Sequence, residues 1–183
     1  WSAKVTSKGQ IAIPKQAREV FNIKEGETLT KDLVIRNLEE KPEDYGTIDF
    51  QAYHFKDKDG NALKNGPWVL CFIDPTREPT KHLLKEISTA AIEFEQWNRP
   101  LIFVVPSDKN AADFNFEDWH LPKNSILCVD EDNNILKNTL SHIKSTFSDN
   151  FPLVLYVDKD GNIKYLSEGY HIGTAKLLLD KKK

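Results

Sequence analysis

Sulfur chemistry is the first possibility that the chain raises, because it contains two cysteines, Cys71 and Cys128. They are far apart in the sequence and fit neither a CxxC redox pair nor the spacing of metal ligands. Each lies inside an apolar run, so we expect two buried thiols that behave as small hydrophobic side chains. A disulfide between them is an alternative that the sequence leaves open.

Other residue types that carry chemistry show no recognisable spacing. The five histidines form neither an HxH nor an HExxH pattern, and only His82 falls near other polar residues of interest. Ser88, Ser125 and Ser141 lack the Gly-x-Ser-x-Gly context of a hydrolase nucleophile. The acidic run at 130–134 lacks the glycine and terminal glutamate of an EF-hand, which predicts a solvated turn. We therefore expect no metal site and no cofactor.

Composition excludes some function classes. The 183 residues are 39% hydrophobic and 29% charged, with a net charge of -3. That balance is typical of a globular protein and gives no overall attraction to nucleic acid or to anionic membranes. No apolar run reaches the roughly 20 residues that a membrane helix needs. The chain has no methionine, so we expect it to be a piece of a longer protein.

Two apolar runs, Trp68–Ile73 and Leu101–Val105, have the length of strands covered on both faces. Between them, residues 79–97 repeat apolar side chains at helical spacing, beginning with Pro79. Strand, helix and strand in this order predict a parallel βαβ unit.

Further elements follow on both sides of this unit. Residues 47–55 alternate, with Ile48, Phe50, Ala52 and His54 on one side, and predict a strand before a turn at 58–61. After the unit we predict a strand at 125–129 and a helix at 135–147. A hairpin of strands 152–157 and 163–166 and a last helix at 175–179 complete the expected order.

This order, and several of its motifs, resemble the TlpA/ResA branch of thioredoxin-like proteins. The leading hairpin at 49–62, the segment Phe151-Pro-Leu-Val-Leu-Tyr-Val-Asp-Lys-Asp-Gly-Asn-Ile-Lys-Tyr165 and Gly169-Tyr-His-Ile-Gly173 carry the likeness. The resemblance implies an α/β protein with a thioredoxin-like fold over residues 47–183. The polar stretch at 39–46, which combines charge with proline and glycine, is the candidate boundary, and strand candidates before it predict a small β-rich module in residues 1–46.

Family members carry Trp-Cys-x-Pro-Cys after the first central strand, where this chain reads Thr76-Arg77-Glu78-Pro79-Thr80. Arg77 and Thr80 replace the two cysteines, and neither can supply a thiolate. We therefore expect no thiol–disulfide oxidoreductase activity, and Thr80 is expected at the helix cap or in its first turn. Pro152 matches the family's cis-proline, so the Phe151–Pro152 bond is a candidate cis bond.

The resemblance makes Arg77, Glu78, Pro79, Thr80, Phe151 and Pro152 the candidate binding residues of a non-catalytic binding or scaffold domain. Residues 71–82 are also similar to the C-terminal part of large secreted bacterial transglutaminase-like proteins, although no Cys-His-Asp arrangement is visible here. This implies an extracytoplasmic location. The implied partners are a peptide, a protein or other domains of the same polypeptide.

The N-terminal residues 3–29 resemble the AbrB/SpoVT pattern, whose family forms DNA-binding dimers. A strand at 11–13, a short helix at 14–21 and a strand at 33–35 are expected there. The matching cations would be Lys4, Lys8, Lys15 and Arg18. Residues 1–29 hold five Lys or Arg against three Glu, so the electrostatic attraction to DNA is small. We favour a structural β module and keep a dimeric DNA-binding regulator as the alternative.

Overall fold

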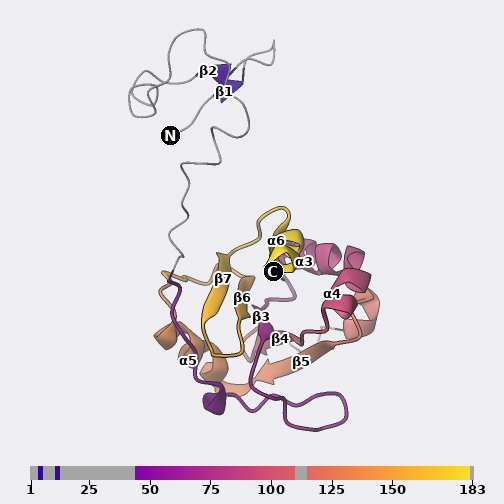
Figure 1. The fold of residues 1–183 in the computed structure, drawn as a ribbon, viewed down its shortest axis with the longest axis vertical. Coiled ribbons are helices and arrows are strands. Elements are labelled where there is room, and N and C mark those ends of the chain that lie inside the picture. Colours follow the sequence, from indigo (N-terminus) through magenta and orange to yellow (C-terminus); the bar gives the residue numbers. More distant parts are fainter. Residues whose placement is uncertain (1–3, 6–10, 13–43, 110–114, 182–183) are drawn as a thin grey trace. The chain divides into compact units, whose positions relative to one another are not determined.

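The computed structural model describes residues 4–5, 11–12, 44–109 and 115–181 (Figure 1). The chain divides into two compact units, Trp1–Pro42 and Glu43–Lys183. In the first unit β1 (Lys4–Val5) pairs antiparallel with β2 (Ile11–Ala12). The helix expected at 14–21 and the strand expected at 33–35 lie outside the described residues.

A five-stranded sheet forms the centre of the second unit, in the order β5-β4-β3-β6-β7 (Figure 1). Strands β3, β4 and β5 run parallel, whereas β6 is antiparallel to β3 and β7 is antiparallel to β6. The predicted βαβ unit and C-terminal hairpin are therefore confirmed. The strands are β3 (Trp68–Phe72), β4 (Leu101–Pro106), β5 (Ser125–Asp130), β6 (Leu153–Val157) and β7 (Ile163–Glu168).

Helices cover both faces of this sheet. Side chains of α3, α4 and α6 pack on one face, and those of α5 pack on the other together with residues 48–55 (Figure 1). The α-helices are α3 (Glu78–Thr89), α4 (Ala91–Trp97), α5 (Asn134–His142) and α6 (Thr174–Asp180). Three short 3-10 turns are η1 (Phe50–Ala52), η3 (Phe116–Trp119) and η4 (Glu131–Asn133).

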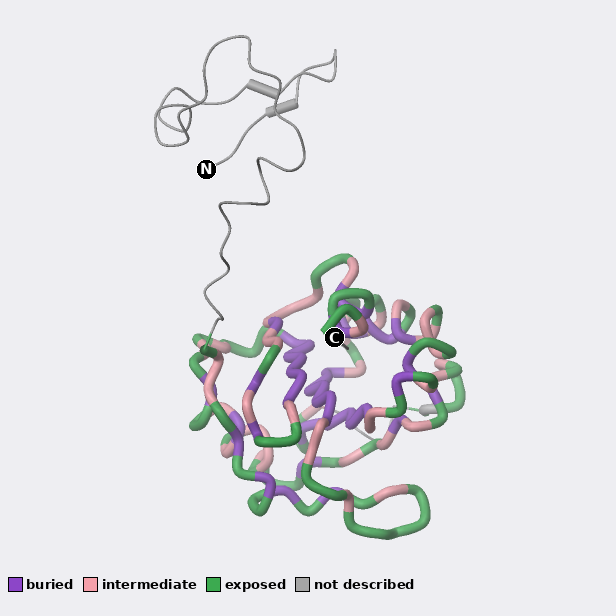
Figure 2. Tube along the Cα trace, viewed as in Figure 1, coloured by how far each residue is buried: buried purple, intermediate pink, exposed green. Residues whose placement is uncertain are grey.

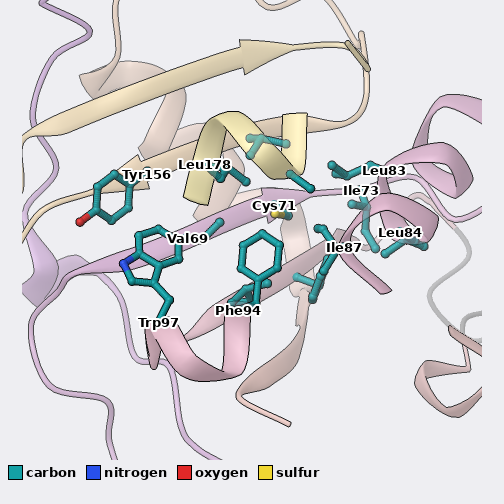
Figure 3. Close-up of a cluster of buried hydrophobic side chains, with 14 of the residues drawn as sticks. Val69, Cys71, Ile73, Leu83, Leu84, Ile87, Phe94, Trp97, Tyr156 and Leu178 are labelled. Carbon is teal, nitrogen blue, oxygen red and sulfur yellow. The ribbon is translucent and has the colours of Figure 1, made fainter. Parts of the chain in front are cut away.

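The central strands are buried along their whole length (Figure 2). Alternate residues of β3 serve the two faces: Val69 and Cys71 join the cluster under α3, α4 and α6, whereas Leu70 and Phe72 join the opposite cluster. Figure 3 shows the first cluster, which includes Cys71 of β3, Phe94 of α4 and Leu178 of α6. A strand with two covered faces needs a continuous apolar run, which explains the sequence of β3.

The expected strand at 47–55 is wrong. Asp49 accepts a hydrogen bond from the Gln51 N–H and begins the η1 turn, which breaks the two-residue alternation. Ile48 and Phe50 are buried as expected. Beyond the turn, however, the buried residues are Tyr53 and Phe55 rather than the exposed Ala52 and His54.

The long helix expected at 79–97 is two helices. Ala90, with φ -101° and ψ 24°, leaves the helical region, so α3 ends at Thr89 and α4 begins at Ala91. The helix expected at 135–147 ends early, at His142, because Ile143 is extended and bridges to Gly46. Apolar spacing continues across both breaks, so the pattern alone could not reveal them.

Two turns of identical sequence, Asp-Lys-Asp-Gly-Asn, connect antiparallel segments at 57–61 and 158–162. In each, the first aspartate accepts the backbone N–H two residues later and the N–H of the asparagine, all at 2.8–2.9 Å. Gly161 has φ +87°, and a Cβ there would lie 2.4 Å from the Ile48 carbonyl oxygen. Glycine is therefore required where the second turn meets residue 48.

The prediction of a solvated turn at 130–134 is wrong for its first residue, Asp130. Asp130 is buried, and its carboxylate accepts the backbone N–H groups of Ile135 and Leu136 at 2.9 and 2.8 Å. These are free donors of the first turn of α5, which the carboxylate therefore caps.

Candidate functional site

The residues that replace the redox cysteines lie at the start of α3. Arg77 is the N-cap residue, in an extended conformation, and Pro79 occupies the first turn of the helix. Glu78 is exposed and pairs with Lys81 at 2.5 Å. Proline in the first turn costs no hydrogen bond, because the N–H groups there have no partner within the helix.

Arg77 does not point freely into solvent. Its Nε donates to Asp74 Oδ2 at 3.1 Å, and its two terminal nitrogens donate to the Asp149 carbonyl oxygen at 2.8 Å and to Asp149 Oδ2 at 2.5 Å. Asp74 is 5% exposed and also accepts the N–H and hydroxyl of Thr76, at 3.0 and 2.7 Å. The guanidinium therefore ties the loop after β3 to the loop before β6.

A second cation completes this arrangement. Lys109, in the loop after β4, pairs with Asp149 Oδ1 at 3.1 Å, and its Nζ lies 5.5 Å from the centroid of the Phe151 ring. The hydrogen bond from Lys109 lowers the pKa of Asp149, and the charges of Lys109 and Arg77 act in the same direction. We call Asp74, Arg77, Lys109 and Asp149 the ion-pair cluster.

The cis-proline position adjoins the ion-pair cluster. The Phe151–Pro152 bond is cis, which confirms the candidate cis bond, and Gly66–Pro67 is a second cis bond. The Gly169 N–H donates to the carbonyl oxygens of Asn150 and Pro152, both at 2.9 Å, so the loop after β7 is joined to the same place. Loops that follow β3, β4 and β7 therefore meet at the segment that precedes β6.

Thr80 lies in the first turn of α3, as expected, and its side chain is fully buried. Its hydroxyl has no hydrogen-bond partner among the described residues. His82, one turn into the helix, stacks on Tyr170 with ring centroids 5.4 Å apart. The Thr80 hydroxyl is therefore enclosed by the fold, and the His82 ring is in contact with an aromatic neighbour.

The two cysteines are free thiols and lie in the sheet. Cys71 is buried in β3, and burial raises the pKa of its thiol to about 12. Cys128 in β5 is half-buried rather than buried, and burial raises its pKa as well. Low thiolate content makes a cysteine a poor nucleophile at neutral pH.

Sequence reasoning missed three of the four members of the ion-pair cluster. Asp74 has a local signal, because an acidic residue three positions before Arg77 can reach its guanidinium. Lys109 and Asp149 have none, since they lie 32 and 72 residues from Arg77 in the sequence and meet it only through the fold.

The candidate DNA-binding cations are not brought together by any described element. Lys4 lies in β1, opposite Ala12, whereas Lys8, Lys15 and Arg18 lie outside the described residues. Their role in the DNA-binding alternative stays a prediction. Within the described residues, no group of three or more His, Cys, Asp or Glu side chains could hold a metal ion. No helix there is both long and apolar enough to cross a membrane.

Comparison with solved structures identifies the architecture, while no family model and no curated protein sequence matches the chain. StoA from Bacillus subtilis superposes with a TM-score of 0.54 and 16% identity, over 72% of this chain and 96% of that protein. A Chlorobium tepidum protein described as the thiol:disulfide interchange protein DsbE gives 0.51 and 13%, over 76% of this chain and 94% of its own. A protein of Neisseria meningitidis described as a thioredoxin gives 0.50 and 14%, over 71% and 86%. The second unit of this chain has the thioredoxin-like fold.

Proposed function

We propose that the thioredoxin-like domain is a non-catalytic binding or scaffold domain that has lost thiol–disulfide exchange. The observation that carries this proposal is the use of Arg77. Exchange needs a nucleophilic thiolate and a resolving thiol, and the position before the helix holds a guanidinium engaged by two aspartates. Neither free cysteine of the chain lies in the loops that meet there.

The ion-pair cluster also supports a binding role rather than a cryptic enzyme. Its charges satisfy one another, so none of its four members is left as a free general base or nucleophile. The surface around it still offers the exposed Glu78 and Pro79 and the half-buried Arg77, whereas Thr80, Phe151 and Pro152 are buried. We propose that a peptide, a protein or another domain of the same polypeptide docks against Arg77, Glu78 and Pro79, and that Thr80, Phe151 and Pro152 support this surface from within the fold.

The proposal includes an extracytoplasmic location within a larger bacterial protein. Its support is the sequence resemblance of residues 71–82 to secreted transglutaminase-like proteins, together with the TlpA/ResA-type motifs. Ion pairs at the position where family members carry their redox cysteines suit a domain that binds a partner rather than one that transfers electrons.

An insulin-reduction assay with dithiothreitol tests the loss of exchange. We expect the chain to precipitate insulin no faster than dithiothreitol alone. The double variant Arg77→Cys/Thr80→Cys should accelerate precipitation, because it restores two sulfurs at the start of α3. Cys128→Ser is the matched control for the half-buried thiol.

One result would contradict the proposal, and a second would show that the site has lost more than its two sulfurs. Acceleration by the unaltered chain would show that one of its own thiols exchanges, and loss of that activity in Cys128→Ser would identify which. If the double variant is as inactive as the unaltered chain, two cysteines at the start of α3 are not sufficient for thiol–disulfide exchange at this site.

A further inference from the structure

The end of the sheet opposite Arg77 carries a hollow of about 370 Å³. It lies where the chain enters β3 and β4, and its apolar walls include Leu63, Pro67, Trp68 and Pro100. We call it the Arg99 hollow, after the cation that lines it. Its volume is within the range of pockets that hold small ligands.

Arg99 lines this hollow with donor groups that have no acceptor among the described residues. Its guanidinium has no hydrogen bond or ion pair with any residue in the described parts of the chain, and its Nε is buried. Arg99 as a whole is half-buried, but a buried N–H donor such as its Nε costs desolvation energy when it has no partner. The other arginine of the thioredoxin-like domain, Arg77, has acidic partners.

Polar atoms beside Arg99 show the same deficit. The Asn124 side-chain amide donates to the Arg99 carbonyl oxygen, while its own Oδ1 is buried without a partner among the described residues. The hydroxyl of the adjacent Ser125, a residue that is 1% exposed, is likewise unpartnered there. Unsatisfied donors and acceptors therefore gather at one corner of the fold.

The walls of the hollow are held in place. Trp68 is 2% exposed and is packed edge-on by Phe50 and Phe55, with ring centroids 4.5 and 5.4 Å away, and its indole N–H donates to the Lys64 carbonyl oxygen at 2.9 Å. A Cβ on Gly66 would lie 2.5 Å from the Asp158 carbonyl oxygen. Such a site is largely preformed and loses little entropy on binding.

Charge in the hollow favours an anion. Lys64 and Arg99 contribute two positive charges and Asp57 one negative charge. The Asp57 carboxylate is engaged by its own turn, where hydrogen bonds from Asn61 lower its pKa. A planar guanidinium pairs best with a planar carboxylate, and the half-buried rings of Pro67 and Pro100 suit a flat apolar body.

We propose that the Arg99 hollow binds a small organic carboxylate, with the carboxylate on Arg99 and its apolar part against the half-buried Pro67 and Pro100, beside the edge of the buried Trp68. This site is separate from the ion-pair cluster, since the two lie beyond opposite ends of β3. It therefore does not depend on the function proposed above.

An NMR titration of the whole chain tests this site, with sodium benzoate as the probe and benzamide as its uncharged match. At constant ionic strength, benzoate should shift the Trp68 indole signal and the backbone amides of Leu63 and Arg99, and should leave Thr80 and Phe151 unmoved. Benzamide should bind roughly tenfold or more weakly, because it lacks the charge.

Variants localise the effect. Arg99→Gln should weaken benzoate binding roughly tenfold or more, whereas Lys123→Gln, an exposed lysine outside the hollow, should not change it. The proposal is overturned if benzoate causes no shifts, if benzamide binds equally well, or if the shifts fall at Thr80 and Phe151. Inorganic phosphate binding as tightly as benzoate would also overturn it, because the apolar walls would then contribute nothing.

Discussion

At the carboxyl end of β3, Arg77 donates to two aspartates, whereas at the amino end Arg99 lines a hollow and has no acidic partner among the described residues. The same side chain type thus serves two purposes in one domain. Arg77 joins two loops, and its charge is paired with Asp74 and Asp149 within the fold. Arg99 keeps its charge available, which is what a ligand site requires and a structural contact does not.

Removal of the buried Asp74 carboxylate, at the carboxyl end of β3, should have the largest effect on stability. Asp74→Ala leaves the Thr76 N–H and hydroxyl and the Arg77 Nε without their acceptor, so we expect a loss of about 2–4 kcal/mol in the free energy of unfolding. Urea denaturation measures it. Asp59→Ala, in an exposed turn, is the control and should cost under about 0.5 kcal/mol. Equal losses in the two variants would mean that Asp74 does not hold the loop.

The two arginines give the sharpest test of the comparison. Methionine keeps much of the side-chain stem and removes the guanidinium, so Arg77→Met should cost about 1 kcal/mol by breaking its partly exposed pairs. Arg99→Met should be neutral or stabilising by up to about 1 kcal/mol, since it removes an unpaired buried donor. Both are measured by the shift of the urea midpoint without added ligand. A loss at Arg99 as large as at Arg77 would show that Arg99 has a structural role.

Acid pH should slightly reduce the stability that the ion-pair cluster contributes through Asp149. The pKa of Asp149 is lowered in the folded chain, so its contribution to stability is present above the unfolded value, about 3.9, and is lost as the pH falls through the folded value. Because Asp149 is half exposed, the effect should be about 0.5 kcal/mol or less. Asp149→Asn should reduce the change in the free energy of unfolding between pH 5 and 2 by that amount, as measured by thermal melts across this range. An unchanged profile would mean that its pairs with Lys109 and Arg77 contribute nothing.

Much of the fold follows from apolar pattern alone. Trp68–Ile73 and Leu101–Val105 read as buried strands because both of their faces are covered, and they are central strands in the structure. The pattern failed where a polar side chain redirected the backbone, as Asp49 does at η1. It failed again at Ala90, where the backbone turns without any change in apolar spacing.

The candidate site was predictable only in part. The positions of Arg77, Thr80 and Pro152 follow from motif resemblance, but the partners of Arg77 come from other loops and have no sequence signal at that spacing. The Arg99 hollow was not anticipated, since a charged residue between a helix and a strand is ordinary in any sequence. Only the packing reveals that its guanidinium is unpaired.

Glu86 gives the C-terminal helix a dependence on the rest of the domain. Its carboxylate, on α3, accepts the N–H groups of Gly173 and Ala175 at 2.8 and 3.2 Å and the Tyr170 hydroxyl at 2.8 Å. Helix α6 has seven residues, too few to persist in water by itself. Its amides should therefore exchange with solvent deuterium only through openings that also release it from α3, so that the last turn of the chain reports on a cooperative unit rather than on a frayed end.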